Sequence, residues 1–186
     1  MPADLSPVST LCLAILHRGE ATGYEIKKEC VEGDYRYFID ASYGAIYPAL
    51  ARLAAEGFAT HREETQPGRP ARKVYAITPK GRDALLTALS EPPEPDVFRS
   101  RFLLVAKFAS ELPQEVVARA LAERRRQLAE ELEHIAKFVE GEGDSPAANW
   151  LAAYGRACLS ASLDHIDTNG DALVALADRP VAHAAE

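Results

Sequence analysis

The segment 41–57 concentrates small and hydroxyl-bearing side chains on one side of an expected helix. On a helical wheel, an apolar stripe from Ile46 to Leu53 faces a core, whereas Gly44 and Tyr47 point away from it. A solvated helix face ordinarily carries Glu and Lys instead. A narrow, uncharged face of this kind is suited to entering a groove of a nucleic acid. An ordinary core helix with two exposed tyrosines is the alternative that this segment leaves open.

Three residues indicate where this helix begins and ends. Ser42 is a good N-cap, and Gly57 stands where a C′ glycine ends a helix. Pro48 lacks the N–H group that a helix interior needs. We therefore expect Pro48 near the first turn or at a kink.

A cationic β-hairpin is predicted directly after the helix. Two alternating runs, 58–64 and 72–78, flank a tip rich in proline and glycine. The tip and its exit carry Arg69, Arg72 and Lys73. A threonine–proline pair then starts a further helix. Three helices, a hairpin and a helix in this order are typical of a winged helix-turn-helix, in which the third helix enters the major groove of DNA.

Four short tracts of the first half keep a common register: residues 23–26, 44–53, 56–58 and 68–81. Together they resemble the PadR family of transcriptional regulators. Tyr-Pro-Ala-Leu and Arg-Lys-x-Tyr-x-x-Thr-x-x-Gly carry the resemblance in combination, although neither is specific alone. The resemblance implies a regulator of transcription that binds double-stranded DNA as a dimer at a pseudo-palindromic operator. It further implies a repressor that responds to a ligand.

The wheel and the resemblance together assign positions at the DNA. Tyr43 and Gly44 are placed near base edges, and Ser42 and Tyr47 on phosphates. The resemblance also places Tyr24 on a phosphate, whereas the nearby lysines are expected to be solvated charges. The hairpin cations hold the adjoining backbone or the minor groove. Because the helix has few long polar side chains, we expect DNA shape to supply much of the specificity.

The charge distribution limits how DNA could be bound. The net charge is −7, residues 1–90 hold 11 basic and 11 acidic side chains, and residues 91–186 hold 10 and 17. A diffuse positive surface is therefore excluded, and binding needs a local cluster of cations. A winged helix that binds a protein partner and no DNA remains the alternative, because the first half is electrically neutral.

A proline-rich stretch marks the boundary between two expected domains. Three prolines fall within residues 91–96, which favours an extended spacer. The expected fold is mainly α with a small β-hairpin. It comprises a winged helix-turn-helix domain over 1–90 and a helical domain for dimerisation and effector binding over 97–186.

The second domain is expected to form three helices, over 97–110, 113–141 and 147–166, with Asn169-Gly170 interrupting the last. Apolar residues of the middle helix alternate between spacings near three and four, which is typical of a short coiled coil. Pairing with a second copy of the chain explains this pattern, and the longer-tailed branch of the resembled family has such a helical dimerisation domain. The residues assigned to the dimer contact are Leu121, Leu128, Leu132, Ile135, Leu151 and Cys158.

Aromatic residues of the second domain are candidates for binding a small effector. Trp150 lies one turn before Tyr154, and Phe102 lies on the stripe of the first helix of this domain. Planar ligands stack on such rings, and sites between bundled helices are common. An aromatic or lipophilic compound is the expected ligand. A tryptophan packed into the core of the dimer is the alternative that remains open.

Motifs for catalysis and metal binding are missing from the sequence. The histidines form no i, i+4 pair, and there is no nucleophile elbow, Walker loop or dinucleotide fingerprint. We therefore expect no enzyme, cofactor or metal ion. No apolar run of membrane-spanning length and no secretory signal occur. Cys12, Cys30 and Cys158 are expected to be reduced core thiols of a cytoplasmic protein.

Overall fold

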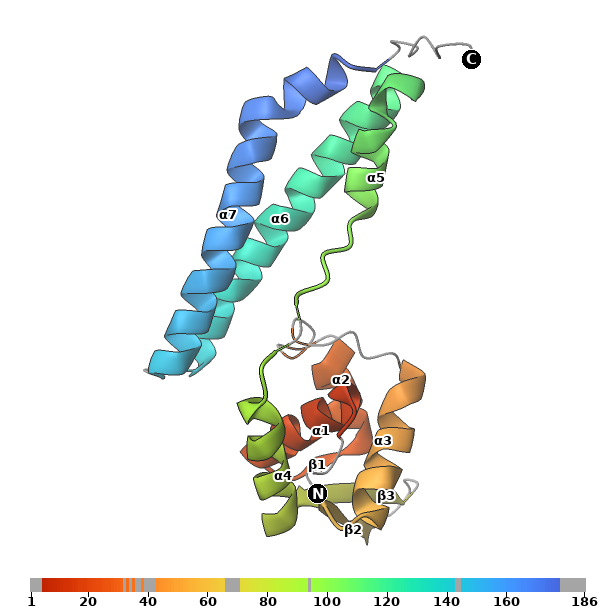
Figure 1. Ribbon diagram of the computed structural model, residues 1–186, viewed down its shortest axis with the longest axis vertical. Coiled ribbons are helices and arrows are strands. Elements are labelled where there is room, and N and C mark those ends of the chain that lie inside the picture. Colours follow the sequence, from red (N-terminus) through yellow and green to blue (C-terminus); the bar gives the residue numbers. More distant parts are fainter. Residues whose placement is uncertain are drawn as a thin grey trace. The chain divides into compact units, whose positions relative to one another are not determined.

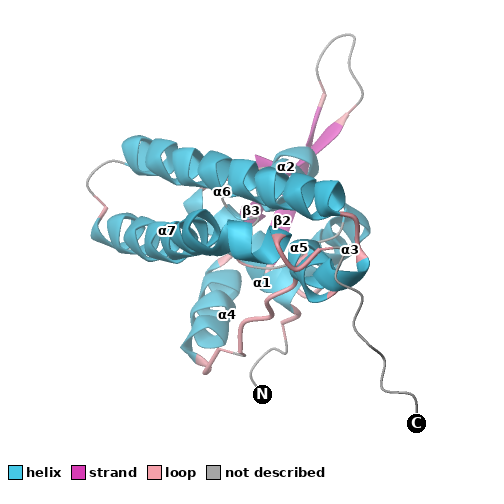
Figure 2. Ribbon diagram, turned by 90° about the horizontal axis from the view of Figure 1, so that it is seen from above, coloured by secondary structure: helices cyan, strands magenta, loops and turns pink. Residues whose placement is uncertain are grey.

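A computed structural model describes residues 5–31, 33, 35, 38, 43–65, 71–93, 95–142 and 145–177. The chain divides into two compact units, Met1–Pro95 and Asp96–Glu186. Helices make up most of each unit, and the strands lie in the first (Figures 1 and 2). The predicted fold class, mainly α with a small hairpin, is confirmed.

The first unit contains four helices and a three-stranded antiparallel sheet. The sheet order is β1-β3-β2, so the hairpin β2–β3 gains a short outer strand that the sequence analysis did not predict. A strand of two residues is too short to show an alternating pattern. The elements are α1 (Pro7–Arg18), β1 (Ala21–Thr22), α2 (Gly23–Val31), α3 (Tyr43–Ala55), β2 (Ala59–Glu64), β3 (Arg72–Ile77) and α4 (Pro79–Ser90).

The core of this unit forms around α1, which packs against α2, α3 and α4 (Figure 1). The apolar stripe predicted for α3 is confirmed, because Ile46, Leu50 and Leu53 are at most 1% exposed. Burying three such side chains stabilises the fold by several kcal/mol, at about 1.5–3 kcal/mol each. The inner face of α3 is therefore fixed, and its opposite face is available for another role.

Local signals set the ends of these helices. The Thr22 hydroxyl accepts a hydrogen bond from the Glu25 N–H at 3.2 Å, and the Glu25 carboxylate accepts from the Thr22 N–H at 2.7 Å. This reciprocal capping box begins α2. Gly57, at φ 77°, follows α3 as predicted. Pro48 lies inside α3, so the carbonyl of Gly44 has no N–H of residue 48 to accept from.

The second unit is a helical hairpin with a short helix against it. Its elements are α5 (Arg101–Lys107), the 3₁₀ turn η2 (Ala109–Glu111), α6 (Gln114–Glu142) and α7 (Pro146–Val174). The first of these helices was expected to start at residue 97. It starts at residue 101 because the Ser100 hydroxyl caps it, accepting from the Leu103 N–H at 3.3 Å. Phe98 therefore precedes the helix and is 75% exposed.

The last helix is longer than predicted, because α7 continues through Asn169 and Gly170. A β-carbon on Gly170 would lie 2.6 Å from Cδ2 of Leu121 on α6, and one on Gly155 would lie 3.0 Å from Cδ1 of Ile135. Both glycines allow the antiparallel helices α6 and α7 to approach closely. The Arg125–Asp167 ion pair, at 2.8 Å, joins the same two helices. Gly170 is thus a packing residue and does not break the helix.

The predictions for the side chains of Leu128 and Cys158 need correction. Leu128 was assigned to a contact between two copies, but it is 0% exposed within one chain, because the stripe of α6 faces α7. Cys158 is exposed, so it is not a core thiol, whereas Cys12 and Cys30 are buried free thiols as predicted. Among the described residues, no helix is both long and apolar enough to cross a membrane.

Candidate nucleic-acid interface

The outward face of α3 is uncharged and accessible. Gly44, Pro48 and Ala51 are exposed, and Tyr47 is 49% exposed. A β-carbon on Gly44 would meet nothing within 4 Å. A glycine in a helix costs about 0.5–1 kcal/mol relative to alanine, and none of the described residues requires one here. The missing side chain therefore leaves room for a group that approaches from outside.

Tyr47 is held in place by the start of α2. A β-carbon on Gly23 would lie 2.8 Å from Cε1 of Tyr47, so the tyrosine ring lies directly on the glycine. Burial raises the pKa of Tyr75 on β3, and the nearby Tyr47 adds to this shift. Tyr24, the residue after Gly23, is 67% exposed. The first turn of α2 and the ring from α3 therefore form one surface beside β3.

Arg72 and Lys73 lie at the start of β3, and both are exposed. The register of the hairpin places Glu64 opposite Arg72 and Glu63 opposite Lys73. The Glu64 carboxylate accepts hydrogen bonds from Nε and Nη2 of Arg72 at 3.2 and 2.9 Å. Both described cations that were predicted to hold DNA, Arg72 and Lys73, therefore face an acidic residue on the neighbouring strand.

A second arginine extends this pairing across the sheet. Arg62 on β2 forms ion pairs with Glu20 at 2.6 Å and with Glu64 at 3.1 Å. Hydrogen bonds from Arg72, and then from Arg62, lower the pKa of Glu64. We call Glu20, Arg62, Glu64 and Arg72 the wing network. The sequence analysis missed it, although the register of two alternating runs contained the signal.

The structure describes five of the predicted DNA contacts. Tyr24, Gly44, Tyr47, Arg72 and Lys73 lie on the exposed surface of α2, α3 and β3. Arg72 also lowers the pKa of the Glu25 carboxyl, as a smaller contribution after the Thr22 hydrogen bonds, which places the wing beside the first turn of α2. The remaining predicted contacts, Ser42, Arg69 and the side chain of Tyr43, lie outside the described residues.

The predicted effector residues do not form one site. Phe102 contributes to a cavity between α5 and α6, beside Ala120 and Arg124. The rings of Trp150 and Tyr154 stack with centroids 5.6 Å apart and are 69% and 56% exposed. They lie near Gly155, which faces residue 135 of α6, about 16 Å along that helix from residue 124. Within one chain, Phe102 therefore lies apart from the Trp150–Tyr154 pair.

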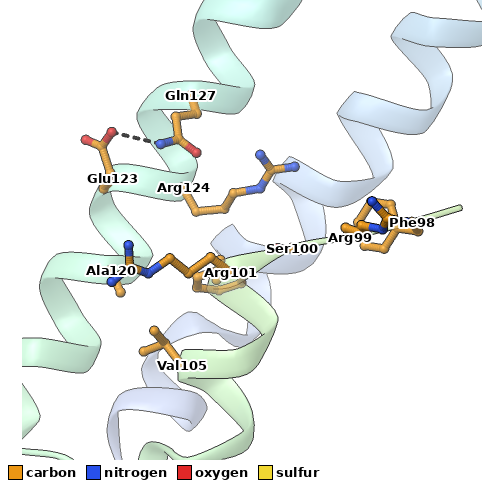
Figure 3. Close-up of a pocket in the computed structure, with 10 residues that line it drawn as sticks. Phe98, Arg99, Ser100, Arg101, Val105, Ala120, Glu123, Arg124 and Gln127 are labelled. Atoms are coloured by element: carbon orange, nitrogen blue, oxygen red, sulfur yellow. Dashed lines mark hydrogen bonds between the residues drawn. The ribbon is translucent and has the colours of Figure 1, made fainter. Parts of the chain in front are cut away.

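The cavity at Phe102 has a volume of about 380 Å³, and its charged lining residues are three arginines and one glutamate (Figure 3). The carboxylate of Glu123 accepts hydrogen bonds from Arg126 at 2.6 Å and from Gln127 at 2.9 Å. The side chain of Arg124 points away from Glu123 and Gln127 (Figure 3). In the described part of the chain, the arginines that line the cavity form no ion pair. The lining residues are Phe98, Arg99, Ser100, Arg101, Phe102, Val105, Ala120, Glu123, Arg124 and Gln127.

Sequence comparison connects the first unit to known regulators. The profile of the family described as "Transcriptional regulator PadR-like family" matches residues 12–87. The negative transcriptional regulator PadR of Bacillus subtilis is 34% identical over 104 residues, which is 55% of this chain and 57% of that protein. The chain therefore matches little more than half the length of this curated relative.

Solved structures share the arrangement of elements along nearly the whole chain. The protein smu.1604c of Streptococcus mutans is 27% identical with a TM-score of 0.78, covering 88% of this chain and 98% of that one. Bacillus subtilis PadR in complex with operator DNA is 22% identical with a TM-score of 0.71, covering 89% and 98%. The same PadR in complex with p-coumaric acid is 22% identical with a TM-score of 0.66, covering 90% of this chain and 99% of that one. Through residues 12–87, this chain belongs to the PadR-like family of transcriptional regulators.

Proposed function

We propose that the chain binds double-stranded DNA and represses transcription, with α3 in the major groove and the hairpin β2–β3 as a wing on the adjoining backbone. The observation that carries this proposal is the outward face of α3. From Gly44 to Ala51 it is uncharged and exposed, and it contains a helix glycine that no described residue of the unit requires. Gly44 would allow the backbone of α3 to approach the base edges closely.

The contacts divide into two kinds. Gly44 and Tyr43 would face base edges, and Ser42, Tyr47 and Tyr24 would meet phosphates. The cations of the wing would hold the backbone or the minor groove. Binding to DNA is supported by a relative of similar sequence that is named a negative transcriptional regulator, and by a PadR structure of the same fold that is in complex with operator DNA.

A homodimer is part of the proposal. Two copies would double the small number of phosphate contacts and would match a pseudo-palindromic operator. Leu151 and Cys158 on α7 remain candidates for the contact between copies, because both are exposed in the single chain. Leu121, Leu132 and Ile135 are partly buried, so they would contribute only their remaining surface. Such a regulator would act in the cytoplasm, where the DNA is.

We propose the cavity at Phe102 as the effector site in place of the Trp150–Tyr154 pair. Two phenyl rings and three arginines that form no ion pair with any described residue suit a small organic anion with an aromatic or lipophilic body. The structure of Bacillus subtilis PadR with p-coumaric acid provides a probe of this class. Calorimetric titration with p-coumaric acid should show binding that Arg101→Ala/Arg124→Ala abolishes. Equal binding by both proteins would exclude the cavity.

The experiment for DNA binding is an electrophoretic mobility shift with the gene's own upstream duplex at low and moderate salt. We expect a shifted complex that competitor DNA of random sequence displaces less well than the upstream duplex. A winged helix that binds only proteins would shift no duplex at either salt concentration. That outcome would reject the proposed function.

A further inference from the structure

The wing is electrostatically self-paired in the free protein. Arg72 donates two hydrogen bonds, from Nε and Nη2, to one carboxylate oxygen of Glu64, at 3.2 and 2.9 Å. A DNA phosphate can bind an arginine through the same Nε–Nη2 edge. Arg72 therefore cannot give both N–H groups to a phosphate while it keeps both bonds to Glu64.

The wing network also contains a second partner for Glu64, Arg62, which can neutralise the carboxylate when Arg72 leaves it. Arg62 donates to Glu64 at 3.1 Å and pairs with Glu20 at 2.6 Å. When Arg72 turns to a phosphate, the Glu64 carboxylate keeps Arg62 as a partner. The exchange therefore leaves no unpaired carboxylate beside the DNA. An unpaired charge in such a place would cost far more than the exchange of one exposed ion pair.

We propose that Glu64 is an internal competitor of DNA phosphate for Arg72, and that it lowers the affinity of the wing for every duplex. This inference rests on the proposed function, and it assigns a regulating role to a residue that touches no DNA base. The competition acts on phosphate binding, so it is independent of sequence. Its consequence is that the wing adds affinity chiefly after α3 has been seated in its groove.

The neighbouring residue provides a matched control. Glu63 lies on the same strand, opposite Lys73, and carries the same charge, but in the described structure it forms no ion pair. Glu63→Gln and Glu64→Gln thus change the net charge equally and differ in the bonds to Arg72 and Arg62. An Arg72→Ala background isolates the part that belongs to Arg72. Both positions are at the surface, and thermal unfolding of each variant reports whether the fold is kept.

The test measures the affinity of the full chain for its upstream duplex and for a random duplex by fluorescence anisotropy. Glu64→Gln should tighten binding to both duplexes by about two- to fivefold, the equivalent of an exposed ion pair. It should also steepen the salt dependence by up to about one unit, because Arg72 then adds a full phosphate contact. Glu63→Gln should change affinity by less than about twofold.

A double-mutant cycle separates competition from general charge. In an Arg72→Ala background, the difference between Glu64→Gln and Glu63→Gln should disappear, because the competed group is gone. If both glutamine variants tighten binding equally with Arg72 present, the competition is wrong while DNA binding stands. If no variant and no wild-type protein binds any duplex, the proposed function fails together with this inference.

Discussion

The outward face of α3 and the hairpin β2–β3 differ in how they meet their surroundings. The exposed face of α3 from Gly44 to Ala51 has no charged group, and no described atom lies within 4 Å of where a β-carbon on Gly44 would be. The hairpin is densely charged, and its two described arginines are already in ion pairs. The face of α3 can therefore fit a groove without charged contacts, whereas the arginines of the hairpin must leave their ion pairs before they can bind phosphate. We therefore assign the fit into the DNA groove to α3, and an affinity for the DNA backbone that Glu64 regulates to the wing.

Filling the space at Gly44 should have the largest effect on DNA binding. Gly44→Leu places a side chain where the fold has room, so the unit should keep its stability or gain up to about 1 kcal/mol. Operator affinity should fall at least about tenfold, because α3 can no longer approach the base edges. Fluorescence anisotropy and thermal unfolding measure the two quantities. Gly44→Ala should show a smaller loss of the same kind, and unchanged affinity in both variants would remove α3 from the groove.

Removing the wing cations should have the next largest effect, of a different kind. Arg72→Ala/Lys73→Ala should weaken binding on operator and random duplexes alike. The slope of log affinity against log salt should flatten by roughly one to two units. Titrations at several salt concentrations provide this slope. A slope identical to that of the wild-type protein would show that the wing does not touch the DNA backbone.

A smaller effect is expected where the two regions meet, at the ring of Tyr47. Gly23→Ala would bring a β-carbon within 2.8 Å of that ring, so the ring must move. We expect operator affinity to fall about two- to fivefold, comparable to the loss of one hydrogen bond. In a Tyr47→Ala background the same change should have no further effect on affinity. An equal loss in both backgrounds would mean that Gly23 acts through something other than Tyr47.

The smallest effect concerns the capping box beside the wing. Hydrogen bonds from Thr22 lower the pKa of Glu25 below its ordinary value of 4.5. A lowered pKa means that the carboxylate stabilises the fold above about pH 4.5 and that this contribution is lost as the pH falls through the folded-state value. Because the group is largely solvated, the contribution is roughly 0.5 kcal/mol.

Thermal unfolding between about pH 7 and pH 3 tests this contribution. Glu25→Gln should be less stable than wild type at neutral pH, and the difference should shrink on acidification. A difference that stays constant over this range would show that the charge of Glu25 has no part in capping α2.

Local signals in the sequence were sufficient for much of the first unit. The stripe of Ile46, Leu50 and Leu53, the cap at Thr78 and the stop at Gly57 each depend on neighbours within a few residues. Such signals act in the chain before it folds, so they can be read from spacing alone.

Signals that depend on distant neighbours were misread. The spacing of Leu128 shows that its face of α6 is buried, but not that α7 of the same chain buries it. Asn169-Gly170 is typical of a helix end, yet Gly170 lies inside α7 and allows close packing against Leu121. The separation of Phe102 from Trp150 likewise follows from which ends of α6 their helices contact. These outcomes are set by tertiary packing, which overrides local propensity.

The most direct test of the proposed interface is hydrogen–deuterium exchange of the full chain with and without its upstream duplex. The first amides of a helix have no intrahelical partner, so those at residues 43–45 should exchange readily in the free protein. We predict that the duplex slows exchange in α3 and at the start of β3, and leaves α6 and α7 unchanged away from contacts between copies. Saturating DNA that leaves exchange in α3 unaltered would contradict the placement of this helix in the groove.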